Sequence, residues 1–90
     1  MSEPLHLPER LDLAAATKLA TDLRAMDGDI TLDASQVKHL GALCLQTLVA
    51  ASRKAKAGGH SFALTDTPEK VLHQLEFMGA SPEQLREGAL

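Results

Sequence analysis

The chain has 90 residues, a formal net charge of −3 and an isoelectric point near 5.7. This length suits one domain over residues 1–90 and is too short to form two separate hydrophobic cores. The chain contains two Phe and neither Trp nor Tyr, so its core must be aliphatic. Nucleic-acid binding is not expected, because the acidic balance offers no basic stripe for phosphates and the aromatics needed for base stacking are missing.

A short strand and a helix are predicted in the first third of the chain. Residues 4–7, "PLHL", alternate in the manner of a strand, and the prolines that flank them suit an edge position, because proline cannot donate to a neighbouring strand. Asp12 is placed to cap a helix over residues 13–26. The buried stripe of this helix is predicted to comprise Ala16, Leu19, Ala20 and Leu23.

A buried strand and a second helix are predicted in the middle of the chain. The strand is "ITLD" at residues 30–33, after a turn in which Gly28 can adopt a positive φ. Val37 and Leu40 are expected to anchor the next connection along the edge of the sheet. A helix over residues 42–57 follows, and its inward face is predicted to comprise Leu45, Leu48, Val49 and Ser52.

The last third of the chain predicts a third strand, at residues 60–66, and two helices. Thr67 is expected to cap the first helix, with Pro68 at its first position and Gly79 at its end. A capping-box pattern in "SPEQ", residues 81–84, predicts a short, frayed C-terminal helix. The inward residues of the longer helix are predicted to be Val71, Leu72, Leu75 and Met78.

The order β-α-β-α-β-α, with one extra short helix, indicates an α/β fold in which helices cover a small mixed β-sheet. The first residues lack a basic segment followed by an apolar run, and no apolar stretch approaches the ~20 residues that span a bilayer. We therefore expect neither a signal peptide nor membrane insertion, and a cytoplasmic location. Cys44 is the only cysteine, which excludes an intramolecular disulfide.

Several stretches together resemble the STAS domain, the fold of bacterial anti-sigma-factor antagonists and of the cytoplasmic tails of sulfate transporters. They are the strand end "LDAS-V", the apolar helix "LCLQTLVAA", its "AGG" stop, and "V-HQLEFMG" after a strand ending in Thr and Asp. "RLDLAAATKLATDL" is similar to the first helix of that family and its lead-in. The sequence pattern "V-HLGA-CLQ-L-AA" further resembles that of small stand-alone STAS proteins encoded among bacterial chemotaxis genes.

The chain departs from the antagonists at their phosphorylation motif. Those proteins typically have Asp-Ser-Ser-Gly or Asp-Thr-Ser-Gly where this chain has Gly41-Ala42-Leu43-Cys44. In this comparison Leu43 takes the place of the phosphorylated Ser and Gly41 that of the Asp. Neither side chain can accept a phosphate, so the resemblance does not imply the hydroxyl chemistry of the family for this chain.

The predicted function is therefore that of a noncatalytic protein-binding module in bacterial signalling, with a site at the start of the second helix. Leu43 and Leu40 would supply the apolar contact with the partner, and Lys38 and His39 would form a polar rim around it. The small residues Gly41 and Ala42 would allow the partner to approach the backbone closely. A plain structural role, with Leu43 packed against Val37 or Leu40, is the alternative. The resemblance implies an ATP-binding kinase-like regulator or a chemotaxis component as partner; the other candidate role is that of a constitutive STAS subunit in a lipid-transport ATPase complex.

No catalytic, cofactor or metal site is predicted. The four histidines are scattered without ligand spacing, and only His39 has a candidate partner, Asp33, near the helix start. Cys44 could be a reactive thiol, because a helix start lowers the pKa of a thiol, but a packing role is the better interpretation. Ser35 and Thr47 are poor substitutes for the missing phosphosite. The basic cluster Arg53, Lys54 and Lys56 is interpreted as a solvated helix end, with contact to an acidic partner or to lipid headgroups as the alternative.

Overall fold

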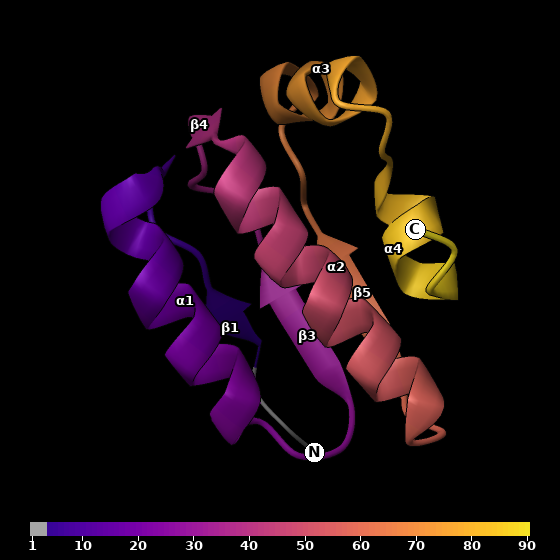
Figure 1. The fold of residues 1–90 in the computed structure, drawn as a ribbon. Helices are drawn as coiled ribbons and strands as arrows, with labels where there is room; N and C mark the ends of the chain where they lie inside the picture. Colours follow the sequence, from indigo (N-terminus) through magenta and orange to yellow (C-terminus); the bar gives the residue numbers. More distant parts are fainter. Residues whose placement is uncertain (1–3) are drawn as a thin grey trace.

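The computed structural model describes residues 4–90. This range contains five strands and four helices, and α1 and α2 lie side by side in front of the sheet (Figure 1). The elements in chain order are β1 (Leu5–His6), β2 (Arg10–Leu11), α1 (Leu13–Ala25), β3 (Ile30–Asp33), β4 (His39–Leu40), α2 (Ala42–Ala57), β5 (Phe62–Thr65), α3 (Glu69–Phe77) and α4 (Pro82–Glu87).

The strands form two small parallel sheets. The three-stranded sheet has the order β1-β3-β5, with Ile30 opposite Phe62 and Leu5 opposite Leu32, so the proline-flanked β1 lies at an edge as predicted. The second sheet pairs β2 with β4. The predicted α/β fold class is confirmed. Each described strand pair is parallel, where a mixed sheet was expected, because the connection between the two strands of each pair contains a helix rather than a hairpin turn.

The core is aliphatic, as the composition requires, and lies between the three-stranded sheet and the helices. Leucines from β2, β3, α2, α3 and α4 are almost fully buried, around a single buried aromatic side chain, Phe62. Three of the four stripe residues predicted for α1 are buried, and Ala20 is half-buried at the margin. On the predicted inward face of α2, Val49 is likewise half-buried; the buried members are Leu45, Leu48 and Ser52.

The starts of α1 and α2 lie where the sequence places them. Asp12 caps α1, because its Oδ1 accepts a hydrogen bond from the backbone N–H of Ala15 at 3.1 Å. Helix α2 has the predicted bounds, and its N-cap is Gly41. The segment before it is anchored by Val37 and Leu40, which are both buried as predicted.

Two predictions for α3 are wrong. The helix begins at Glu69, because Pro68 keeps an extended ψ of 151° and so occupies the capping position itself. Thr67 therefore precedes the cap, and its Oγ1 is buried without a hydrogen-bond partner in the structure. Leu72 is exposed rather than inward, because only one narrow stripe of this nine-residue helix, Val71 and Leu75, faces the core.

The C-terminal helix is packed and capped, where a frayed helix was expected. The backbone N–H of Gln84 donates to Ser81 Oγ at 3.2 Å, which confirms the capping pattern. Leu85 is fully buried, and its carbonyl oxygen accepts a hydrogen bond from the buried hydroxyl of Ser52 on α2. Helix α4 thereby covers β5, the edge of the sheet opposite β1.

Candidate functional site

The segment that leads into α2 is held by backbone hydrogen bonds to the strand that precedes α1. The amides of Lys38 and His39 donate to the carbonyl oxygen of Glu9 at 2.7 and 3.2 Å, and the amide of Gly41 donates to Leu11 O at 2.8 Å. These bonds fix the start of α2 beside the start of α1. The surface around Leu43 is therefore part of an ordered structure rather than of a free loop.

Leu40 is tied to α3 as well as to the core. Its backbone N–H donates to the side-chain Oε1 of Gln74 at 2.8 Å, across 34 positions of the sequence. Its side chain is buried, so it cannot supply the apolar contact with a partner that the sequence suggested. This prediction is wrong because Leu40 points inward from β4, in the same register as Leu11 of the paired strand.

Leu43 has the opposite orientation. It is the second residue of α2 and its side chain is 46 % exposed, so it is not packed into the core against Val37 or Leu40. Ala42 beside it is exposed as well. An apolar side chain at the solvated start of a helix can provide contact area to another molecule without the cost of desolvating a charge.

The rest of the predicted surface is polar and exposed, with one exception. Lys38 and His39 are exposed, and Lys38 Nζ lies 3.8 Å from Glu9 Oε1. A Cβ at Gly41 would lie 3.2 Å from the carbonyl oxygen of Leu11, so the missing side chain permits close packing within the fold. A side chain at Gly41 would be crowded by β2, and the exposed residues of the predicted surface are Lys38, His39, Ala42 and Leu43.

The start of α2 offers neither a hydroxyl nor a side-chain cap. Gly41 makes no side-chain hydrogen bond to the helix, and the first turn has no acidic residue. The nearest hydroxyl on the helix, that of Thr47, donates to the carbonyl oxygen of Leu43 at 3.1 Å. Ser35 lies before β4, and its backbone N–H is bound to the carboxylate of Asp33 at 2.8 Å.

Cys44 is fully buried, and its thiol donates to the carbonyl oxygen of Asp12 at 3.3 Å. Burial, and secondarily the negative charge of Asp12, raises the pKa of this thiol. A protonated, buried thiol is a poor nucleophile. The structure therefore favours the packing role of Cys44.

Asp33 forms its histidine contact with His6 rather than with His39. His6 Nδ1 on the edge strand β1 lies 3.1 Å from Asp33 Oδ2, because the parallel register places these residues opposite each other. His39 is instead exposed on β4. Within residues 4–90 no group of three or more His, Cys, Asp or Glu side chains is arranged to hold a metal ion.

Two carboxylates accept backbone hydrogen bonds that lower their pKa values. The backbone N–H of Ser35 lowers the pKa of Asp33 below its usual value of 3.8, and that of Ser61 does the same for Asp29. A lowered pKa in the folded state means that unfolding takes up protons. The stability that each carboxylate contributes is present above about pH 3.8 and is lost as the pH falls through the lower folded-state value.

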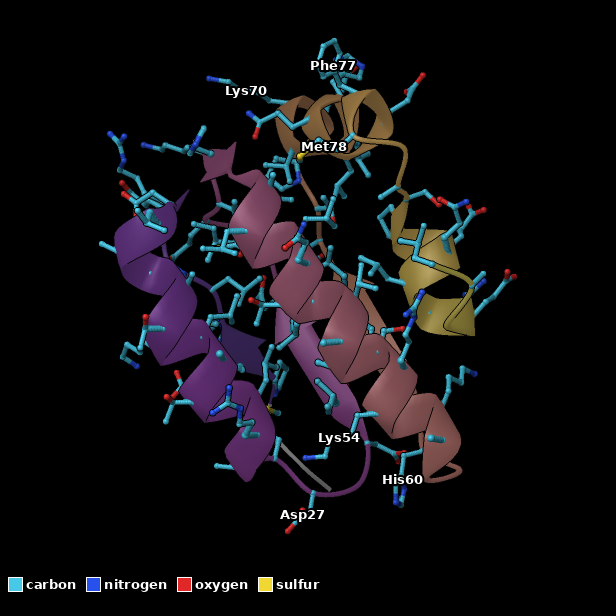
Figure 2. The ribbon with its side chains drawn as sticks, in the orientation of Figure 1. Asp27, Lys54, His60, Lys70, Phe77 and Met78 are labelled. Atoms are coloured by element: carbon cyan, nitrogen blue, oxygen red, sulfur yellow. The ribbon has the colours of Figure 1, made fainter. Side chains whose placement is uncertain are left out.

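We expect Asp33→Asn to flatten the loss of stability between neutral pH and pH values below 3.8, because the substituted side chain no longer titrates. Urea midpoints measured across this range test the prediction. Asp27→Asn, in the exposed turn before β3, controls for the removal of a surface carboxyl (Figure 2). An equal acid dependence in wild type and Asp33→Asn would show that the carboxylate–amide contact contributes nothing to stability.

A groove between α1 and α2, which the sequence did not reveal, begins at Leu43. It has a volume of about 300 Å³ and runs between the two helices toward Arg24 and Lys54. Its apolar lining comes from Leu23 and from the short side chains of Ala20 and Ala50. Alanines on both helices were visible in the sequence, but the hollow that they leave depends on how the helices pack.

The arrangement described so far is that of a small α/β domain with parallel strands and an exposed apolar residue at the start of a helix. Residues 2–86 match the family model described as "Mlab, STAS domain". The chain therefore belongs to the STAS domain family, whose members are generally noncatalytic modules that bind protein partners. Searches of curated proteins and of solved structures gave no match. Within residues 4–90 no helix is both long and apolar enough to cross a membrane.

Proposed function

We propose that this STAS domain is a noncatalytic docking module of bacterial cytoplasmic signalling that binds its partner through the start of α2. The observation that carries the proposal is the exposure of Leu43 on a surface fixed by backbone hydrogen bonds. The docking surface comprises Leu43 and Ala42, with Lys38 and His39 as its polar rim. Truncating a central apolar anchor of an interface commonly costs about 2 kcal/mol or more.

The proposed interaction cannot be switched by phosphorylation at the start of α2. A phosphoryl group there would add a charge of about −1.5 to −2, but the residues from Gly41 to Cys44 carry no hydroxyl to accept it. Leu43, in the place where antagonists carry the modified Ser, presents a permanently uncharged contact. Binding would therefore follow the concentration of the partner rather than a modification of this domain.

The partner proposed is an ATP-binding kinase-like regulator or a chemotaxis component. A second candidate function is that of a constitutive STAS subunit in a lipid-transport ATPase complex. The observation that favours it is the same permanently apolar helix start, because a structural subunit needs no switch. The two candidates differ in the proteins that should co-purify with the domain. The first predicts a signalling protein from the cytoplasm, and the second predicts an ATPase subunit together with its membrane proteins.

We expect Leu43→Asp to abolish retention of the partner in a pull-down from native cell extract, with bound proteins identified by mass spectrometry. A charged side chain would be buried against the partner, while a carboxylate in the first turn of α2 favours the helix itself. The variant should therefore remain folded, which circular dichroism and the urea midpoint can verify.

Leu13→Asp provides the matched control, because Leu13 is 75 % exposed in the first turn of the neighbouring helix α1. It introduces the same change near the same end of the fold, outside the docking surface. Retention by Leu13→Asp and loss by Leu43→Asp would support the proposal. Retention by both variants would contradict it, and loss in both would attribute the effect to negative charge rather than to the Leu43 side chain.

A further inference from the structure

The groove between α1 and α2 continues directly from the docking surface. Leu43 lines one end, and Lys54, eleven residues further along the same helix, lines the other. At 1.5 Å per residue these positions are about 16 Å apart along α2, which corresponds to three turns of a helix. Figure 2 shows Lys54 at the end of the molecule opposite α3, on the side of α2 that faces the end of α1.

The middle of the groove is lined by apolar side chains, three of which are alanines, and Gln46 and Thr47 line the part between Leu43 and Ala50. Ala20 and Leu23 of α1 face Ala50 and Ala51 of α2 across the hollow of about 300 Å³. Short side chains on two adjacent helices leave room for large apolar side chains of another element. A groove of this kind is suited to an amphipathic helix, which inserts side chains spaced three and four residues apart.

The charge of the groove is opposite in sign to that of the chain. Its two titratable lining residues, Arg24 and Lys54, are both cationic and exposed, whereas the chain as a whole has a net charge of −3. Lys54 Nζ donates to the carbonyl oxygen of Arg24 at 3.3 Å, which holds the two cations at the same end. Within residues 4–90 neither of them forms a salt bridge, so both charges are available to carboxylates of another molecule.

We infer that the groove binds an amphipathic, acidic helix of the protein partner. The apolar side chains of that helix would fill the hollow between Leu43 and Ala50, and its carboxylates would lie over Arg24 and Lys54. The two ends of the groove thus differ in chemistry, which fixes the direction of the bound helix. This inference rests on the proposed function, because Leu43 belongs both to the docking surface and to the groove.

Photo-crosslinking at two positions distinguishes the groove from the docking surface. A benzoylphenylalanine probe at Gln46, which is exposed and lines the groove, is compared with the same probe at His39, on the polar rim and outside the groove. After irradiation in native cytoplasm, mass spectrometry identifies the crosslinked segment. We expect both probes to capture the same protein, and the Gln46 probe to map to a helix with apolar residues at three- and four-residue spacing and Asp or Glu near one end.

The captured segment, as a synthetic peptide, then tests the charge at the end of the groove. We expect Lys54→Glu to weaken its binding about tenfold or more, and reversal of the acidic residues of the peptide to Lys to restore binding to this variant. Lys56→Glu is the matched control, because Lys56 lies in the same last turn of α2 but does not line the groove. It should change the affinity by less than about twofold.

Three results would overturn the inference while leaving the proposed function intact: capture by the His39 probe without capture by the Gln46 probe, a crosslinked segment without acidic residues, or equal affinities in the Lys54→Glu and Lys56→Glu variants. Crosslinking of lipid instead of protein at Gln46 would also overturn it. If neither probe captures a protein, the proposed function fails together with the inference.

Discussion

Replacing Phe62 with Ala is expected to lower the free energy of unfolding by about 3–5 kcal/mol, measured by urea denaturation. Phe62 is fully buried at the start of β5, where it lies opposite Ile30 of β3. Its removal loses the transfer free energy of the ring and leaves a cavity between the sheet and the helices. The loss is a large fraction of the total stability of a small domain, which is typically about 5–15 kcal/mol.

The chain contains its own control for this prediction. Phe77, the other aromatic residue, is 93 % exposed at the end of α3. Phe77→Ala makes the same chemical change and is expected to shift the free energy of unfolding by less than about 0.5 kcal/mol. Equal losses in the two variants would show that burial of Phe62 is not the source of the stability attributed to it.

Leu85→Ala is expected to destabilise the protein by about 2–5 kcal/mol and to release α4 from the sheet. A helix of six residues is too short to be stable by itself, so its structure depends on its packing. Leu85 provides the fully buried side chain of α4, and its carbonyl oxygen accepts the hydroxyl of Ser52. Both contacts weaken if the helix moves.

Two measurements test the Leu85 prediction, namely urea denaturation and hydrogen exchange of the backbone amides. Exchange should accelerate in α4 and in β5, which α4 covers, more than in β1 at the opposite edge of the sheet. Leu13→Ala, at an exposed leucine, provides the control and should leave both measurements near those of the wild type. A destabilised variant with uniformly accelerated exchange would show that α4 and the sheet unfold as one unit.

The predictability of each element followed its length and the strength of its terminal signals. Helix α2 was predicted with its exact bounds, because sixteen residues carry several turns of periodicity and Gly41 and Gly58 delimit them. The two-residue strands β2 and β4 were not predicted, whereas β1, which is equally short, was predicted because prolines flank its alternating residues. Strands β2 and β4 form because the segments before α1 and α2 pair with each other, an interaction between positions far apart in the sequence.

The candidate site was predictable as a segment but not residue by residue. The sequence located the start of α2 as a surface, yet it could not decide that Leu40 points inward and Leu43 outward. That difference arises from the pairing of β4 with β2, which fixes the orientation of Leu40. Likewise, the sequence alone could not show why position 41 favours Gly. A Cβ there would lie 3.2 Å from the carbonyl oxygen of Leu11, a contact that only the folded chain creates.

The hydrogen bond from the Leu40 amide to Gln74 links the position of α3 to that of the segment before α2. If α3 drifts away, this amide on a buried residue loses its acceptor, and an unsatisfied buried donor is costly. Small displacements of α3 are therefore resisted at the entrance to α2, even though the two segments are distant in the chain. Helix α3 lies at the same end of the molecule as β4 (Figure 1), so this hydrogen bond couples its position to the segment before α2.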